Sequence, residues 1–249
     1  MTSNRSLAAA VGGIATVLLF LLVNPWVTTE PGSMVNQAIT VGFWIAFVIL
    51  LVILFQERNQ PGGETIEIEG PAFTRFLFGN STAGLFWLPI RLFLGFSWLE
   101  AGYHKFADGG WIDGGSSLLA YWERAAAIPE EGRPAISYDW YRAFIQMLID
   151  NGAEAWMGYV ITFGEMAVGI GLLLGVLTGF AAFFGAMMNM SFLLAGSAST
   201  NPVLFTLAIG LMLAWKVAGY YGADRWLLPL LGTPWHPRAV AGHETGPAT

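Results

Sequence analysis

The stretch RLFLGFSWLEAGYHKF, residues 91–106, is apolar enough to form a membrane helix, yet it carries four ionisable side chains. They are Arg91, Glu100, His104 and Lys105. A charged side chain at the centre of a bilayer costs about 2.5 to 3.5 kcal/mol on insertion scales. Ionisable residues in membrane helices therefore usually face a bundle interior or mark a functional site. This stretch decides the fold class and directs the search for a site.

The composition of the whole chain favours a membrane protein. Its 249 residues are 55% hydrophobic and 11% charged, whereas an average soluble domain has about 25% charged residues. The chain has no cysteine, which excludes disulfides, iron–sulfur ligation and Cys-based zinc sites within it. We also expect no haem, since only one of three histidines is near a membrane segment, and we expect no flavin or metal site in this chain. A net charge of −6 does not favour nucleic-acid binding.

Six apolar stretches approach the roughly 20 residues that a helix needs to cross a bilayer. They are residues 6–23, 36–55, 82–104, 155–175, 179–198 and 202–221. The first could be a secretory signal, but no A-x-A-like cleavage site follows it, so we retain it as a helix. We predict an all-α integral membrane protein with about six transmembrane helices. In chain order it has an N-terminal helix pair (1–60), a cytoplasmic linker (61–81), a four-helix domain (82–232) and a polar tail (233–249).

Lysine and arginine in short loops predict the orientation. With both termini in the cytoplasm of a multi-pass plasma-membrane protein, five arginines lie inside: Arg5, Arg58, Arg75, Arg225 and Arg238. Residues 105–154 then form an outer loop with two predicted helices. Ser116 or Ser117 would cap the first, and the second would begin at Ser137 and stop at Gly152.

Residues 91–106 present two polar faces when they are placed on a helix with about 100° per residue. Glu100 and His104 lie on one side, one turn apart. The glycines of the other side leave space for a flat ligand or for a neighbouring helix, and its lysine either lines a site or snorkels to the headgroups. That side contains Arg91, Gly95, Trp98, Gly102 and Lys105.

Arg91 needs a partner because it is expected near the bilayer centre. Glu165 is about ten residues from the outer end of the next membrane helix, so we predict an ion pair between these residues. Asn189 lies on a small-residue stripe and should face the same interior. A purely structural pair is the alternative, but buried ion pairs contribute little to stability. We therefore favour a functional polar centre.

Residues 84–232 resemble the DoxX/DoxD membrane family. RLFLGFSWLEAGYHKF is similar to the first core helix of that family, with its arginine, two glycines and lysine. FGEMAVGIGLLLGVLTGFAA (163–182) is similar to the second core helix, and residues 189–227 resemble the closing helix pair. WIDGGSSLLAYWERA (111–125) is closest to the DoxD-type large subunit of thiosulfate dehydrogenase (quinone).

The resemblance implies a DoxX-like four-helix bundle, preceded here by two extra helices, that passes electrons from thiosulfate to a diffusible quinone and forms tetrathionate. A small DoxA-like subunit or a larger respiratory complex would be its partner, in addition to the lipid bilayer. Arg91, Lys105, Glu165 and Asp224 occupy the polar positions of the family.

Three sets of site residues follow as hypotheses. Arg91 and Glu165 would be catalytic, Trp98, Gly95, Gly102 and Asn189 would bind quinone, and His104, Lys105 and Arg124 would bind the anionic substrate. Two other functions stay open. One is that of an accessory subunit of a respiratory or other electron-transfer complex, and the other is transport of small anions or metabolites.

Overall fold

The computed structural model describes residues 2–23, 33–57 and 70–232, which contain helices and no strand. The chain divides into two compact units, Met1–Glu69 and Gly70–Thr249. The predictions for Arg58, His236, Arg238 and His243 lie outside the described residues.

The first unit is a helical hairpin made of α1 (Thr2–Val23) and α2 (Met34–Glu57). Gly12 lies against Leu50 and Gly42 lies against Leu18, so the two helices are antiparallel. Large apolar side chains such as Trp44 are exposed on the surface of this unit. An exposed apolar surface of this kind suits contact with lipid. Both helices lie where the sequence predicted them.

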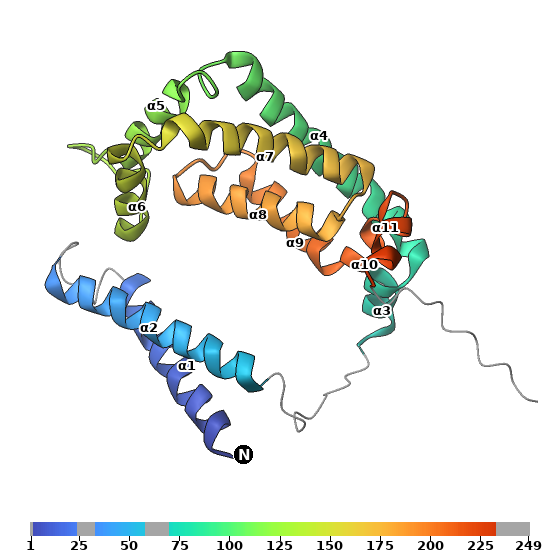
Figure 1. Ribbon diagram of the computed structural model, residues 1–249, viewed down its shortest axis with the longest axis horizontal. Helices are drawn as coiled ribbons and strands as arrows, with labels where there is room; N and C mark the ends of the chain where they lie inside the picture. Colours follow the sequence, from blue (N-terminus) through green and yellow to red (C-terminus); the bar gives the residue numbers. More distant parts are fainter. Residues whose placement is uncertain (1, 24–32, 58–69, 233–249) are drawn as a thin grey trace, which may run out of the picture. The chain divides into compact units, whose positions relative to one another are not determined.

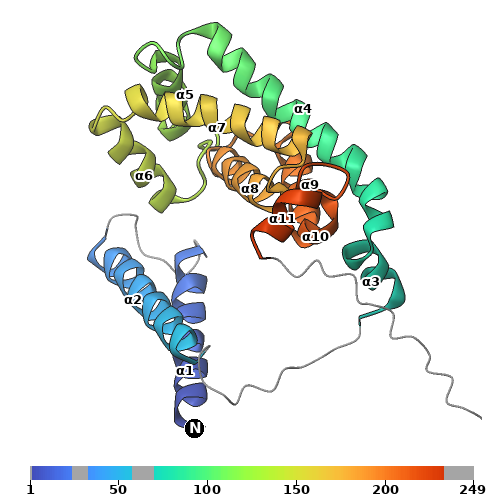
Figure 2. The same cartoon turned by 45° about the vertical axis from the view of Figure 1, so that its right-hand side comes forward.

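The second unit is built on a bundle of four helices (Figures 1 and 2). They are α4 (Gly84–Asp108), α7 (Glu154–Leu174), α8 (Thr178–Leu194) and α9 (Asn201–Leu213). Helix α7 packs between α4 and α8, while α9 packs against α8 and α4. The bundle core includes Trp87, Leu94, Trp98, Val168 and Leu172. Four helices therefore occur where the sequence predicted them, and the first three are close to the expected ranges.

The last predicted helix is shorter than expected. Helix α9 ends at Leu213, and a turn at Ala214 separates it from the short helix α10 (Trp215–Ala218). The prediction of one continuous helix over residues 202–221 is therefore wrong. Lys216 belongs to the short helix α10.

Helices α4 and α7 are antiparallel and in close contact. A Cβ added at Gly95 would lie 2.8 Å from Leu173 Cγ, and one added at Gly102 would lie 2.6 Å from Met166 Cγ. Moving one residue toward the end of α4 therefore corresponds to moving one residue toward the start of α7. This register gives the relative depth of every side chain on the two helices.

Short helices cover the two ends of the bundle (Figure 1). At the end where α4 begins lie α3 (Ala72–Gly79), the 3-10 turn η1 (Ser81–Ala83), α10 and α11 (Asp224–Leu230). The indole of Trp87 donates a hydrogen bond of 2.8 Å to the Leu77 carbonyl and so ties α3 to α4. The part of the predicted linker (61–81) that the structure describes is largely helical, because α3 occupies most of it.

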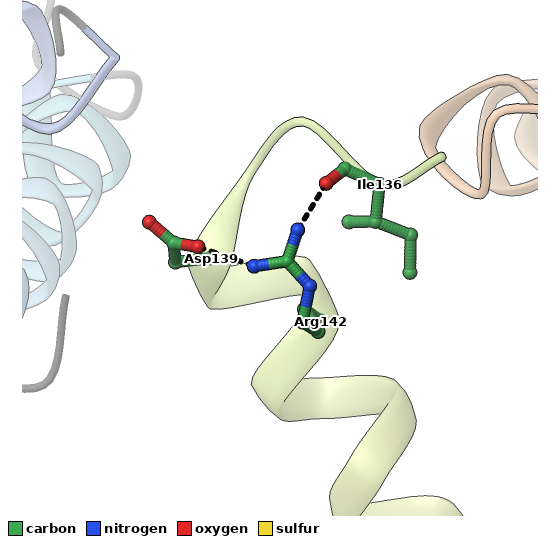
Figure 3. A network of polar contacts seen from close by, with 3 residues as sticks. All are labelled: Ile136, Asp139 and Arg142. Carbon is green, nitrogen blue, oxygen red and sulfur yellow. Dashed lines mark hydrogen bonds and ion pairs between the residues drawn. The ribbon is translucent and has the colours of Figure 1, made fainter. Parts of the chain in front are cut away.

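At the opposite end, α5 (Ser116–Ala126) and α6 (Asp139–Asp150) form a second small core with Leu118, Trp122 and Ile136. The predicted serine caps are wrong. Ser117 donates its hydroxyl to Asp108 (3.0 Å), and α6 begins without a side-chain cap. Arg142 instead fixes the start of α6 by donating to Asp139 and to the Ile136 carbonyl (Figure 3).

Three helical segments of the described part are long and apolar enough to cross a membrane: Met34–Ile53, Ser81–Asp108 and Glu154–Leu174. Apolar helices of 10 to 17 residues occur at Ser6–Leu22, Thr178–Leu194 and Asn201–Leu213. The chain is a membrane protein by these features. The count of six membrane crossings and the orientation stay predictions.

Candidate functional site

Arg91 is buried at the end of the bundle where α4 begins. Its Nη1 donates to the Leu172 carbonyl and its Nη2 donates to the Tyr221 carbonyl, both at 3.0 Å. A Cβ added at Gly175 would lie 2.0 Å from Nη1, so only glycine leaves room for the guanidinium there. Charge-assisted hydrogen bonds to backbone carbonyls are among the stronger ones in proteins. Arg91 thus links the end of α7 to the turn before α11.

The predicted ion pair between Arg91 and Glu165 is wrong. Arg91 lies beside Gly175, which is ten residues past Glu165 and so roughly 15 Å away along a helix. The depth estimate placed Arg91 near the bilayer centre, whereas the first turns of α4 lie among α3, η1 and α10. The two residues therefore belong to different centres.

Asp224 completes the centre around Arg91. Its carboxylate accepts hydrogen bonds from the backbone N–H groups of Leu177 (2.6 Å) and Thr178 (2.8 Å), at the N-terminus of α8. A carboxylate at this position satisfies free N–H groups and complements the helix dipole. Asp224 also interacts electrostatically with Arg91. We call Arg91, Asp224 and these backbone groups the arginine centre, and its geometry indicates a structural clamp.

The partner of Glu165 is Lys105. Lys105 Nζ lies 2.7 Å from Glu165 Oε2, and the side chains are 16% and 1% exposed. The same ammonium group lies 5.0 Å from the centroid of the Trp111 ring and 5.6 Å from that of Phe192. Lys105 therefore points into the bundle and does not snorkel to the headgroups.

Several polar atoms on α4, α7 and α8, one of them from Glu165 itself, are buried without a hydrogen-bond partner among the described residues. They are Glu165 Oε1, Thr162 Oγ1, Trp98 Nε1 and both polar atoms of the Asn189 side chain. Buried polar groups of native proteins nearly always bind a protein group, a water or a ligand. We call Trp98, Lys105, Thr162, Glu165 and Asn189 the polar core.

These residues lie on the buried faces of α4, α7 and α8. Thr162 and Glu165 are one turn apart on α7, and the Lys105 ammonium reaches α7 from α4. On α8, a Cβ added at Gly185 would lie 2.9 Å from Trp98 Nε1, and Asn189 is one turn further along. The sequence correctly turned Glu165 and Asn189 to the interior and placed Trp98 and Lys105 on one face of their helix, but it did not single out the Lys105–Glu165 contact. The signal available in the sequence for this contact was that Lys105 shares one face of its helix with Trp98.

The predicted open slot beside Trp98 is wrong. Gly95 and Gly102 are buried against α7, where their missing side chains let the two backbones approach. Small residues commonly serve this purpose in membrane helix pairs. Of the two alternatives left open by the sequence, helix packing is the observed one for both glycines.

The predicted substrate-binding residues do not converge. His104 lies on the opposite side of α4 from Lys105, 74% exposed and 3.9 Å from Glu100. Arg124 is exposed on α5, where its Nε donates to the Ala120 carbonyl at 3.1 Å. An anion site formed jointly by His104, Lys105 and Arg124 is therefore not assembled in this structure.

A partly open apolar pocket of about 730 Å³ lies between α7 and α8 and is bordered by α5 and α6. This volume is within the range of small-molecule sites. Two wall residues also adjoin the polar core: Phe192 lies over Lys105, and a Cβ at Gly185 would contact both Val168 and Trp98. The sequence did not reveal the pocket, because its walls come from four separate helices. Other wall residues include Trp122, Tyr141, Val160, Phe184 and Met187.

Comparison with known proteins gives one family. The family model of DoxX matches residues 86–197, from the first turn of α4 to the end of α8. No curated protein and no solved structure matches the chain. The match includes every residue of the polar core and every wall of the apolar pocket. Residues 86–197 of this membrane protein are thus a DoxX family domain.

Proposed function

We propose that this protein is a membrane subunit of a quinone-linked oxidoreductase. In this proposal the apolar pocket binds the quinone, and the polar core exchanges protons with it. The observation that carries the proposal is the buried Lys105–Glu165 ion pair of a DoxX domain, in which one carboxylate oxygen has no partner among the described residues and the lysine lies against Phe192, a wall residue of the apolar pocket.

The chemistry of a quinone suits this combination. Its ring and isoprenoid tail require an apolar site, its carbonyl oxygens accept hydrogen bonds, and its reduction to quinol consumes two electrons and two protons. The pocket supplies the apolar walls. Asn189 Nδ2 and Trp98 Nε1 are free donors, and Glu165 Oε1 is a free acceptor for a proton. Phe192 and Val168 form the boundary that the quinone head would share with the polar core.

Thiosulfate is the electron donor that we propose from the DoxD-type resemblance. Two thiosulfate ions would form one sulfur–sulfur bond and become tetrathionate, releasing two electrons. These electrons and two protons convert one quinone to quinol. Because His104, Lys105 and Arg124 do not converge, we assign the thiosulfate site and any bound electron carrier to a partner subunit, for which a small DoxA-like protein is the candidate.

Photolabelling with an azidoquinone tests the quinone site directly. We expect the label on α7 and α8 peptides, with competition by unmodified quinone. Gly164→Phe should abolish this labelling, because Gly164 lines the pocket and its nearest neighbour, Met188 Sδ, would lie 3.8 Å from an added Cβ. Phe163→Leu is the matched control, since the adjacent Phe163 is exposed on the bundle surface. Equal labelling of the two variants would refute the assignment of the pocket.

A further inference from the structure

Helix α4 carries an unusual polar stripe on the side that faces away from the bundle. Glu100 and His104 are the centre of this stripe, with side chains that are 75% and 74% exposed and atoms 3.9 Å apart. Ser97 and Ala101 lie next to them on the same side of the helix. We call Ser97, Glu100, Ala101 and His104 the outer stripe.

The register of α4 and α7 places the outer stripe within the candidate membrane span of each helix. Leu99 lies against Gly169 and Gly102 lies against Met166, so His104 is level with Gly164, the midpoint of α7. Helix α7 has 21 residues, a length of roughly 31 Å, which is close to the ~30 Å hydrocarbon core. Helix α4 itself ends at Asp108, four residues beyond His104, so Glu100 and His104 point outward within the membrane-spanning part of both helices, in the half nearer the end of α4.

Lipid is a poor environment for these two side chains. Ionisable residues within membrane-spanning segments almost always face protein or a water-filled cavity. The exposed sides of the neighbouring helices have the expected apolar character, with Phe163 on α7 and Phe183 on α8. The outer stripe must accordingly be covered by protein that offers polar groups.

The N-terminal helices of the same chain do not offer an ionic complement. Residues 6–23 and 38–55 contain no Asp, Glu, His, Lys or Arg. The outer stripe, in contrast, is complementary to itself. It carries one acid and one base a single turn apart, so a second copy presents a base to each acid and an acid to each base.

We propose that two copies of this chain associate through the outer stripe, with α4 against α4 around a two-fold axis normal to the membrane. Glu100 of each copy then bonds His104 of the other, as an isologous interface requires. Ser97 and Ala101, four residues apart, are small enough to let the two helices approach closely. This interface is independent of quinone binding.

Cysteine crosslinking tests the interface, because the chain has no cysteine of its own. Ala101→Cys and Ser97→Cys, each expressed alone and oxidised in native membranes, should give a covalent product of twice the chain mass. Phe183→Cys is the depth-matched control. Gly171 lies against Ala181, so Phe183 is level with Gly169, and it is exposed on α8. We expect no dimer from this control.

Two further variants test the complementarity. Glu100→Leu leaves imidazoles without their acid partners and should lower the crosslinked fraction of Ala101→Cys by about fivefold. The exchange of both side chains, Glu100→His with His104→Glu, restores an acid opposite each base and should restore the crosslink. The proposal is overturned if neither Ser97→Cys nor Ala101→Cys gives a dimer, if Phe183→Cys crosslinks equally well, or if the Ala101→Cys variant crosslinks mainly to another protein.

Discussion

Removal of the Lys105 charge is the sharpest test of the polar core. Lys105→Met leaves the Glu165 carboxylate 1% exposed with neither oxygen paired. Breaking a buried ion pair from one side costs about 3 to 5 kcal/mol in other proteins. We expect a loss in this range for Lys105→Met. Glu165→Gln should cost less, because the surviving ammonium is 16% exposed and lies over the Trp111 and Phe192 rings.

The double variant Lys105→Met with Glu165→Gln leaves neither charge unpaired. Contacting residues couple by roughly 0.5 to 3 kcal/mol, so the double variant should be more stable than the sum of the single losses predicts. Thermal unfolding in detergent measures this effect. For a chain of this size, 1 kcal/mol corresponds to about 2 to 4 °C, so Lys105→Met should lower the Tm by roughly 6 to 20 °C.

Activity separates a structural ion pair from one that handles protons. If Glu165 exchanges protons with quinone, the double variant regains stability while thiosulfate-dependent quinone reduction in membranes stays lost. Glu131→Gln, on an exposed loop, is the control and should retain activity. Recovery of activity in the double variant would refute the catalytic role of Glu165.

The same measurement distinguishes the two polar centres. Arg91 bonds carbonyls at the end of α7, roughly 15 Å along the helix from Glu165. Arg91→Met and Glu165→Gln should therefore lower stability additively, within about 0.5 kcal/mol. A larger coupling between them, or strict additivity of the Lys105 and Glu165 changes, would show that the observed pairing is not the one in the membrane.

Two other predictions concern packing and orientation. Gly102→Ala should destabilise the protein by about 1 to 3 kcal/mol, because its Cβ would lie 2.6 Å from Met166 Cγ, whereas Gly164→Ala meets only Met188 Sδ at 3.8 Å and should be nearly neutral in the same thermal assay. With both termini in the cytoplasm, an impermeant thiol reagent should label Ser117→Cys but not Gly242→Cys in intact cells, and labelling of Gly242→Cys alone would reverse the orientation.

Helix phase could be predicted from the sequence, but helix register could not. The 100° periodicity correctly turned Glu165 and Asn189 inward and separated Trp98 and Lys105 from Glu100 on opposite sides of α4. Depth was estimated by counting residues from an assumed membrane boundary. This count failed because the start of α4 packs among short helices, one of which, α3, lies within the predicted linker.

Features that depend on distant segments were also hidden in the sequence. The apolar pocket requires α5 and α6 to fold over α7 and α8, and no local pattern indicates that arrangement. Asp224 was identified only as a polar position of the family, whereas its role as a cap for α8 depends on a contact across 46 residues. Local periodicity thus predicted which helix faces are polar. Long-range packing decided which residues of these faces contact one another.

The four ionisable groups of residues 91–106 have different environments, and the difference supports both proposals. The charge of Arg91 is compensated by the backbone carbonyls and Asp224 that surround it. Lys105 is paired with Glu165 Oε2, but Glu165 Oε1 has no hydrogen-bond partner among the described residues. This unpaired oxygen points to a ligand or to proton exchange. Glu100 and His104 have only each other at 3.9 Å, on a surface that is level with the middle of α7. Because nothing in the described bundle compensates this last pair, its environment has to come from another molecule, and a second α4 is the surface with matching charges.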